Sequence, residues 1–187
     1  FNDITQRDIV ERYKIKNIKQ IKELARYLIT NTGNLTTYNQ LKGLTQIKSV
    51  NTIINYISYL ENAYLLFKVP YFSYSLKKQV SNPFKIFAID TGLRNAISFK
   101  FSKDVGRLYE NLVAIELKRR GKEIYYWKNP LHEEVDFVIK EEKTKQLIQV
   151  CYDIDDINIK KRELKALLKS SKELKCNNLM VITNDYE

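Results

Sequence analysis

The sequence contains little of what a flexible, secreted or membrane-bound chain needs. Its 187 residues include only five glycines and three prolines, too few for a long flexible linker. No apolar run approaches the roughly 18 residues that a membrane-spanning helix requires. The N-terminal stretch also lacks a signal-peptide pattern. We therefore expect a chain that packs into compact domains and has no membrane partner.

Side chains used in redox chemistry and metal binding are equally scarce. Cys151 and Cys176 lack any metal-ligand or CxxC spacing, so the simplest interpretation is two free thiols in a reducing compartment. We accordingly expect a cytoplasmic protein. With His132 as the only histidine, we expect neither a histidine-based metal site nor a catalytic triad within the chain.

Positive charge is abundant but unevenly distributed. The net charge is +10, and residues 1–103 contain 16 Lys and Arg against 6 Asp and Glu, whereas residues 104–187 contain 16 of each kind. A basic half favours nucleic acid as a partner, because contacts with phosphates release counterions. The alternatives are a solubilising surface or a face that docks on an acidic neighbour. The chain begins with Phe1, and we expect it to be a fragment of a longer protein.

The first half has the pattern of a small helical module. Residues 3–17 begin as a helix and continue as a basic tether. Apolar spacing and turn signals then predict helices at 18–30, at 38–43 and after the N-cap Ser49, followed by strands at 64–72 and 84–90. Three helices followed by a two-stranded ribbon are typical of a winged helix, whose third helix can enter the major groove of DNA.

The base-reading chemistry of this module is weak. Its third helix offers hydroxyl and amide groups but no arginine, which is the commonest specific base reader. In the alternative interpretation, these groups only solvate a helix face. The candidate contacts with double-stranded DNA are Lys48, Asn51, Thr52, Asn55, Lys77 and Lys78.

The second half alternates helices and strands. The predicted elements are a helix at 106–120, strands at 123–128, 133–140 and 146–152, a helix at 158–171 and a strand at 178–183. The resulting order is αβββαβ, so we expect an α/β (α+β) chain.

Three elements of the second half carry polar residues in a suggestive order. Glu110 lies on the first helix, Asp136 in the second strand, and Gln149 and Cys151 lie two apart in the third strand. This order resembles the restriction-endonuclease-like fold, in which a Glu, an Asp and an E-x-K motif occupy these places. The resemblance implies that Glu110 and Asp136 hold Mg²⁺, a metal that prefers oxygen ligands and activates water.

The third strand departs from that pattern. Glutamine is a neutral and weaker Mg²⁺ ligand, and cysteine supplies no positive charge. We therefore expect Glu110, Asp136, Gln149 and Cys151 to form a degenerate catalytic set, and the chain itself not to be catalytic. Two alternatives remain: Asp136 pairs with Arg107 and Cys151 only fills the core, or a lysine has migrated to the following helix. The candidates for such a lysine are Lys160, Lys161 and Lys165.

A second resemblance covers nearly the whole chain. The segments that carry it are ENAYLLF at 61–67, FSYSLKKQ at 72–79, KIFAIDTGL at 85–93, YENLVA at 109–114, EVDFV at 134–138 and LIQVCY at 147–152. Their order is similar to the C-terminal part of a family of archaeal and bacterial AAA-type ATPases. The C-terminal domain of unknown function in that family is similar to restriction endonucleases.

This resemblance implies an organisation in three parts. Residues 1–17 resemble the tail of an ATPase lid, 18–100 a winged-helix-like domain and 101–187 a restriction-endonuclease-like domain. Since the chain has no G-x-x-x-x-G-K-[ST] loop, ATP and its Mg²⁺ belong to an N-terminal ATPase domain of the full-length protein. That domain is an expected partner, and we expect no cofactor in this chain beyond Mg²⁺ at Glu110 and Asp136.

Three functions follow from these patterns. The first is a module that gives an ATPase its DNA or partner specificity. The second is a Mg²⁺- or Mn²⁺-dependent deoxyribonuclease that uses Glu110 and Asp136. The third is a protein-interaction platform, in which the basic half docks on an acidic partner.

Overall fold

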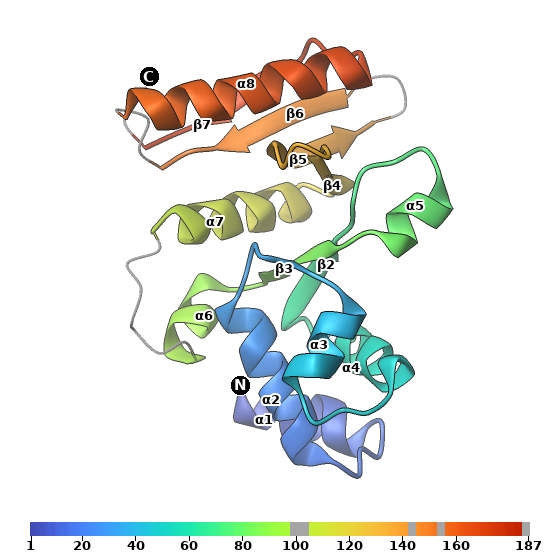
Figure 1. Cartoon of the computed structure of the whole chain (residues 1–187). Coiled ribbons are helices and arrows are strands. Elements are labelled where there is room, and N and C mark those ends of the chain that lie inside the picture. Colours follow the sequence, from blue (N-terminus) through green and yellow to red (C-terminus); the bar gives the residue numbers. More distant parts are fainter. Residues whose placement is uncertain (98–104, 142–144, 153–155, 185–187) are drawn as a thin grey trace. The chain divides into compact units, whose positions relative to one another are not determined.

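The chain folds into two compact units with a sheet in each. The computed structural model describes residues 1–97, 105–141, 145–152 and 156–184. The first unit comprises Phe1–Lys68 and Pro83–Ser102, and the second comprises Val69–Asn82 and Lys103–Glu187. The first sheet has three strands and the second has four, with helices in both units, so the mixed α/β class predicted from the sequence is confirmed (Figure 1).

The first unit begins with a helical segment that packs into its core. α1 spans Asn2–Ile4 and continues as the π-helix η1 over Thr5–Glu11. Ile9 and Val10 are buried and belong to the same apolar cluster as the helices that follow. The helix expected at the start of residues 3–17 thus contributes to the core of this unit.

α2 spans Ile18–Thr30 and has one buried face, as the spacing of its apolar residues predicts. Ile21, Leu24, Ala25 and Leu28 are buried on this face. Ile18, the first residue of the helix, is 37% exposed.

α3 and α4 follow as predicted, with different capping. α3 spans Tyr38–Leu44 and begins with a capping box formed by Thr37 and Gln40. α4 spans Val50–Asn62, and the Ser49 side chain makes no capping hydrogen bond there. Ser49 thus occupies the predicted N-cap position but makes no side-chain capping bond. Its backbone carbonyl accepts the first helical hydrogen bond, from the Ile53 amide at 3.3 Å.

The buried face of α4 is a single helical stripe. Ile53, Tyr56, Ile57 and Leu60 are buried, whereas Ile54 is 39% exposed. These four positions follow the i, i+3, i+4, i+7 spacing of a single helical stripe, and Ile54 lies outside it.

The first sheet has three strands where two were predicted. β1 spans Leu35–Thr36, β2 spans Leu66–Val69 and β3 spans Phe84–Ala88, in the spatial order β1-β3-β2. β1 pairs antiparallel with β3, which is buried along its whole length. A short helix that was not predicted, α6 at Thr91–Ile97, follows β3.

The segment between β2 and β3 groups with the second unit. It contains the short helix α5, Leu76–Ser81. The Phe72 amide donates to the Tyr126 carbonyl at 2.7 Å, and the Tyr126 amide donates to the Pro70 carbonyl at 3.1 Å. Phe72 is buried edge-on against the Tyr125 ring, so this segment extends one edge of the second sheet.

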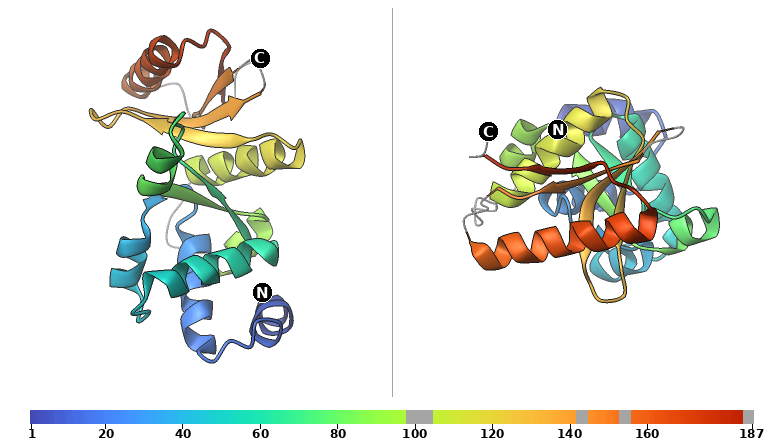
Figure 2. Two further views of the ribbon diagram at one scale, coloured as in Figure 1. Left: turned by 90° about the vertical axis from the view of Figure 1, so that its right-hand side faces the viewer. Right: turned by 90° about the horizontal axis from the view of Figure 1, so that it is seen from above.

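The second unit is a four-stranded sheet between two long helices. The elements are α7 (Val105–Arg119), β4 (Ile124–Lys128), β5 (Glu134–Lys140), β6 (Lys145–Val150), α8 (Ile157–Leu174) and β7 (Leu179–Ile182). The spatial order is β4-β5-β6-β7, antiparallel except for the parallel pair β6 and β7. α8 covers one face of this sheet and α7 the other (Figures 1 and 2).

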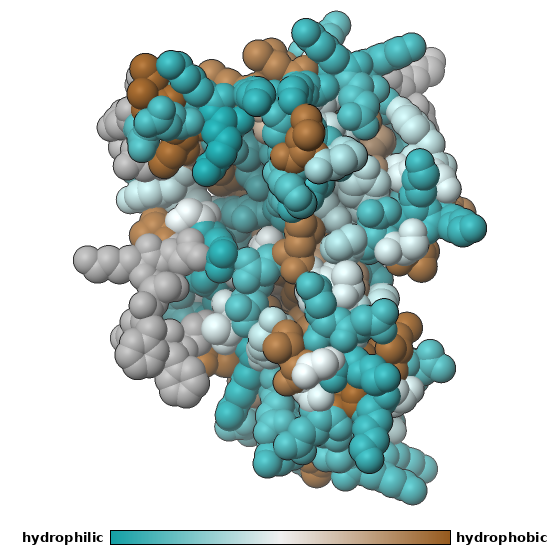
Figure 3. Space-filling model, in the orientation of Figure 1, coloured by the Kyte–Doolittle hydropathy of each residue, from teal (hydrophilic) through white to brown (hydrophobic). Residues whose placement is uncertain are grey.

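α8 is apolar on its inner face and basic on its outer face. Ala166, Leu167 and Leu174 are buried against the sheet. On the outer face, Ile157 and Leu168 are exposed among lysines, and the space-filling view shows such mixed colouring over this helix (Figure 3). No helix in the described part of the chain is long and apolar enough to cross a membrane.

Candidate functional site

A polar hollow of about 560 Å³ lies in the second unit. α7, the turn between β4 and β5, strands β5 and β6, and α8 all contribute to its wall. Its charged and titratable lining residues are Arg107, Glu110, His132, Glu133, Glu134, Asp136, Arg162 and Glu163, and the amide Gln149 lies with them. Glu110, Asp136 and Gln149, which the sequence singled out, thus line one hollow.

Only one end of the Gln149 side-chain amide has a hydrogen-bond partner. Its Nε2 donates to Oε2 of Glu163 at 2.6 Å, whereas its Oε1 is buried and has no hydrogen-bond partner among the described residues. The residue is only 4% exposed. A buried acceptor without a partner costs about 1–3 kcal/mol, so such groups are rare without a compensating role.

Asp136 is held by the backbone of the neighbouring strand. Its Oδ2 accepts from the Val150 amide at 3.0 Å, next to Gln149 in the sequence. This bond fixes the carboxylate on the wall of the hollow, since a carboxylate that accepts a backbone N–H is oriented as well as stabilised. Glu110 reaches the same wall from α7.

Glu163 and Arg162 form a charged pair at the other side of the hollow. The Arg162 guanidinium donates to Oε1 of Glu163 from Nη2 at 2.6 Å and from Nε at 3.0 Å. The hydrogen bonds to Glu163 are the main reason why the pKa of Arg162 is raised, with smaller electrostatic contributions from Cys151 and Asp156. Arg162 therefore stays positively charged and places a cation close to Cys151.

The remaining carboxylates of the hollow are paired with lysines. Glu133 accepts two hydrogen bonds from Lys169, at 2.8 and 2.7 Å, and forms an ion pair with Lys165 at 3.2 Å. Glu134 pairs with Lys128 at 3.2 Å. Hydrogen bonds from Lys169, then Asn129, lower the pKa of Glu133 from 4.5 to about 2. These contacts give Glu133 and Glu134 structural partners of their own.

His132 lies at the rim of the hollow in a strained turn. Its φ is +62°, a left-handed conformation that costs a residue with a Cβ about 1–2 kcal/mol. Asn129 holds this turn, because its Oδ1 accepts from the amides of Leu131 and Glu133 at 2.9 and 3.0 Å. His132 is exposed, so its imidazole is accessible from solvent.

The donor set limits the metals that the hollow can hold. Within the described residues, no three His, Cys, Asp or Glu side chains come close enough together to hold a metal ion. The lining carboxylates are Glu110, Glu133, Glu134, Asp136 and Glu163, and the Gln149 amide adds a neutral oxygen. This all-oxygen set suits a hard cation such as Mg²⁺ or Mn²⁺ better than a soft one.

Cys151 does not line the hollow. It follows the last residue of β6, is 7% exposed, and donates its backbone amide to the Ile182 carbonyl at 2.9 Å. Of the lysines proposed as migrated catalytic groups, Lys165 pairs with Glu133, and neither Lys160 nor Lys161 belongs to the lining. The cationic groups that do line the hollow are Arg107 and Arg162.

The candidate DNA contacts are distributed over both units. Lys48 precedes α4, and Asn51 and Asn55 are exposed along this helix, with Thr52 half-buried beside them. The two wing lysines, Lys77 and Lys78, are exposed on α5, in the segment that groups with the second unit.

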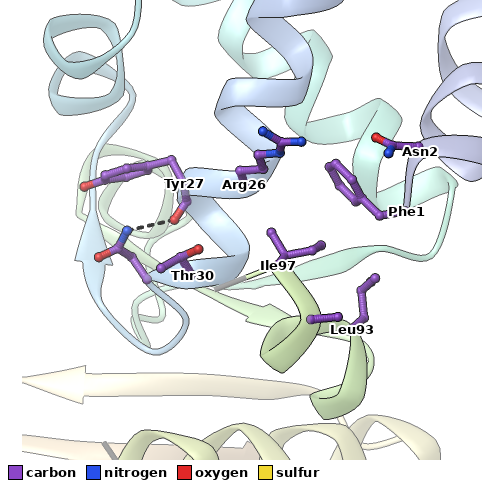
Figure 4. A pocket seen from close by; sticks show the side chains of 9 residues that line it. Phe1, Asn2, Arg26, Tyr27, Thr30, Leu93 and Ile97 are labelled. Atoms are coloured by element: carbon purple, nitrogen blue, oxygen red, sulfur yellow. Dashed lines mark hydrogen bonds between the residues drawn. The ribbon is translucent and has the colours of Figure 1, made fainter. Parts of the chain in front are cut away.

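A second hollow, of about 600 Å³, lies in the first unit (Figure 4). Phe1, Leu93 and Ile97 form its apolar wall, and the Arg26 guanidinium lies 6.0 Å from the centre of the Phe1 ring. None of the described residues that line it is an Asp, Glu, His, Cys or Lys. Its lining therefore offers contact surface but no acid–base or metal chemistry.

Glu163 and Arg162 are the site residues that sequence reasoning missed. A signal for Glu163 exists: it lies three, four, seven and eleven positions before Ala166, Leu167, Ser170 and Leu174, the buried stripe of α8. A charged residue in line with a buried stripe indicates a partner inside the fold.

Comparisons with known proteins place both halves of the chain in families without an assigned function. Residues 1–104 match the family described as Domain of unknown function (DUF8612), and residues 105–187 match Domain of unknown function (DUF4143). No solved structure matches the chain significantly.

Two curated proteins are similar to most of the chain. Uncharacterized protein MJ1544 of Methanocaldococcus jannaschii is 42% identical over 196 residues, which cover 98% of this chain and 42% of that protein. An uncharacterized protein of Haemophilus influenzae is 30% identical over 161 residues, which cover 83% of this chain and 40% of that protein. The chain thus spans about two fifths of the length of these relatives.

Proposed function

The chain belongs to the family described as Domain of unknown function (DUF8612), and we propose that it is a DNA-binding module. In this proposal, a winged helix is joined to a restriction-endonuclease-like domain whose catalytic site is incomplete. The module serves as the C-terminal specificity part of a longer AAA-type ATPase, as the sequence motifs suggest.

The topology of the first unit is the observation that carries this proposal. α2, β1, α3, α4, β2 and β3 follow one another, and the sheet order is β1-β3-β2. This order is typical of a winged helix, in which the short first strand pairs with the third. α4 then takes the place of the recognition helix. The segment between β2 and β3 would take the place of the wing, although it groups with the second unit.

The chemistry of the exposed groups supports duplex DNA as the ligand. Lys42 and Lys48 flank the approach to α4, are exposed, and have no ion pair in the described part of the chain. Asn51 and Asn55 face solvent on α4. Lysines bind phosphates and asparagine amides can pair with adenine edges, so this surface suits backbone contacts with modest base selectivity.

The second unit supports an incomplete nuclease more than an active one. Its αβββαβ order and the hollow that holds Glu110, Asp136 and Gln149 agree with the restriction-endonuclease-like fold. Among the described residues no lysine lines this hollow, and Arg162 holds its charge in a pair with Glu163. Cleavage by Glu110 and Asp136 with Mn²⁺ is the second candidate function, favoured by the unsatisfied oxygen of Gln149.

Binding to a labelled DNA duplex, measured by fluorescence anisotropy over a range of salt concentrations, tests the proposal. We expect the logarithm of the affinity to fall linearly with the logarithm of the salt concentration, by about 0.9 per phosphate contact. No binding to any duplex, or an affinity that does not change with salt, would contradict it. Plasmid cleavage with Mn²⁺, lost in Asp136→Ala, would establish the second candidate instead.

A further inference from the structure

We propose that the corner between η1 and α2, residues 12–16, is a second phosphate-binding element of the first unit. This basic corner lies at the end of α4 opposite Lys48, and its ligand is the sugar-phosphate backbone of duplex DNA. Tyr13 is the positioning residue that holds the corner against α4. The inference rests on the proposed function, because it adds a contact to the same DNA interface.

The basic corner has a defined backbone conformation. The Tyr13 amide donates to the Ile9 carbonyl at 2.9 Å, and the Ile15 amide donates to the Val10 carbonyl at 3.0 Å. Lys14, between them, has a φ of +51°, the left-handed conformation in which many helices end. The corner therefore presents its side chains from an ordered backbone, which lowers the entropic cost of binding.

Tyr13 attaches the basic corner to the C-terminal end of α4. Its ring stacks on the Tyr59 ring, with the two centroids 3.7 Å apart and the planes at 12° to each other. Its hydroxyl accepts a hydrogen bond at 3.2 Å from Nδ2 of Asn62, the last residue of α4. A stacked aromatic pair stabilises packing beyond the area that it buries, so these contacts hold the corner beside the helix end.

The exposed polar face of α4 ends at this contact. Its exposed polar side chains follow the i, i+4, i+7, i+11 spacing of one helical stripe: Asn51, Asn55, Ser58 and Asn62. Lys48 lies just before the start of the stripe, and Asn62 at its end contacts Tyr13. The stripe proposed to face DNA therefore has a basic segment at each end.

α4 is long enough to reach across the major groove. Its 13 residues rise by about 1.5 Å each, which gives a length of about 20 Å. The major groove of B-DNA is about 12 Å wide, so a helix of this length that lies across the groove reaches the phosphates on both sides. Cations at both ends of α4 can then neutralise phosphates of both strands.

The charges of the basic corner are accessible to an anion. Lys14 and Lys16 are exposed and form no ion pair with any residue that the structure describes. Arg12 is exposed as well, and its guanidinium lies 5.6 Å from the centre of the Tyr13 ring. Their place at the end of the polar stripe favours the DNA backbone over an acidic protein as the ligand.

Duplex binding measured by fluorescence anisotropy at several salt concentrations tests the basic corner. In Lys14→Gln with Lys16→Gln, the slope of log affinity against log salt concentration should become shallower by about two, since each phosphate contact contributes roughly 0.9. Lys161→Gln with Lys172→Gln is the matched control. It neutralises two exposed lysines of α8 in the second unit, and its slope should equal that of the wild type.

Two variants of Tyr13 separate positioning from a general loss of structure. Tyr13→Phe keeps the aromatic stack, so its slope should stay close to that of the wild type. Tyr13→Ala removes the stack and should weaken binding by up to the same factor as the double lysine variant. It should have no further effect once Lys14 and Lys16 are neutralised, because a residue that acts through these lysines is coupled to them. A merely structural Tyr13 would weaken binding by the same factor in both backgrounds.

The results that overturn this inference differ from those that overturn the proposed function. Equal slopes in the wild type and the folded Lys14→Gln, Lys16→Gln variant overturn the inference, and so does an equal effect of Tyr13→Ala in both backgrounds. If Lys42→Ala with Lys48→Ala still makes the slope shallower, the DNA-binding proposal stands without the basic corner. Absence of duplex binding by the wild type overturns both.

Discussion

The two units organise their charges in opposite ways. Residues 1–103, most of which form the first unit, carry 16 basic against 6 acidic side chains, and exposed lysines such as Lys42 and Lys48 have no ion pair in the described part of the chain. Residues 104–187 carry equal numbers, and around the polar hollow Glu133, Glu134 and Glu163 each have a cationic partner.

The difference separates two uses of charge. A cation without a protein partner is available to an anionic ligand and attracts it over a distance set by the ionic strength. A charge paired within a fold positions its neighbours, as Arg162 positions Glu163. The first unit is therefore suited to bind a polyanion, and the second to hold a defined geometry.

The largest effect is expected from removing two exposed lysines, in one double variant for each unit. In the double variant Lys42→Ala with Lys48→Ala, the slope of log affinity against log salt concentration should become shallower by about two. Each phosphate contact contributes roughly 0.9 to that slope. The matched double variant Lys161→Ala with Lys172→Ala removes two exposed lysines of α8 and should leave the slope unchanged. Equal effects of the two double variants would mean that the division of charge does not determine where DNA binds.

The next test concerns the turn that carries His132 in the second unit. Asn129 accepts from two backbone amides and donates to Glu133 at 2.6 Å, so Asn129→Ala should destabilise the second unit by about 2–3 kcal/mol, roughly one for each bond lost. Urea unfolding followed by the fluorescence of Trp127, the only tryptophan and a buried residue of this unit, measures the change.

The corresponding change in the first unit should be smaller. Thr37→Ala removes the capping box of α3 and should cost about 1 kcal/mol, seen in the far-ultraviolet circular dichroism transition. If the units unfold separately, Trp127 fluorescence should not register the Thr37 variant. A coincident shift of both signals would show instead that the two units unfold as one.

Periodicity predicted the long elements well, whereas three of the short ones were missed. α2 was predicted with the observed bounds, because thirteen residues give a clear helical stripe. β1 has two residues and exists through its pairing with β3, which local sequence does not reveal. α5 and α6 are also short, with six and seven residues, so their patterns are too brief to distinguish from loops.

The sequence predicted site residues only where the order of helices and strands determines where a residue lies in the fold. The placement of a helix and two adjacent strands suggested that Glu110, Asp136 and Gln149 lie together, and all three line one hollow. Glu163 reaches Gln149 through the packing of α8 on the sheet, a tertiary contact across 14 residues of sequence. The functional role of these residues stays a prediction.

The smallest expected effect is on stability: it comes from the ion-paired carboxylate Glu133 and depends on pH. The pKa of Glu133 is lowered to about 2 by hydrogen bonds from Lys169, then Asn129, so the folded state favours the ionised form. This contribution is complete above the unfolded-state pKa of 4.5 and is lost as the pH falls toward 2. Glu133→Gln should therefore be less stable than the wild type at neutral pH, and the difference should vanish between about pH 5 and pH 2.

Glu116→Gln provides the comparison within the same unit. Hydrogen bonds from Arg119, then Arg120, lower the pKa of Glu116 to about 2 as well, so the pH window should be the same. These partners lie three and four residues along the exposed surface of α7, where ion pairs contribute little. Glu133 instead joins the turn before β5 to α8, so its substitution should have the larger effect. Equal effects in urea unfolding at neutral pH would show that pairing around the hollow adds no more than pairing on an open helix.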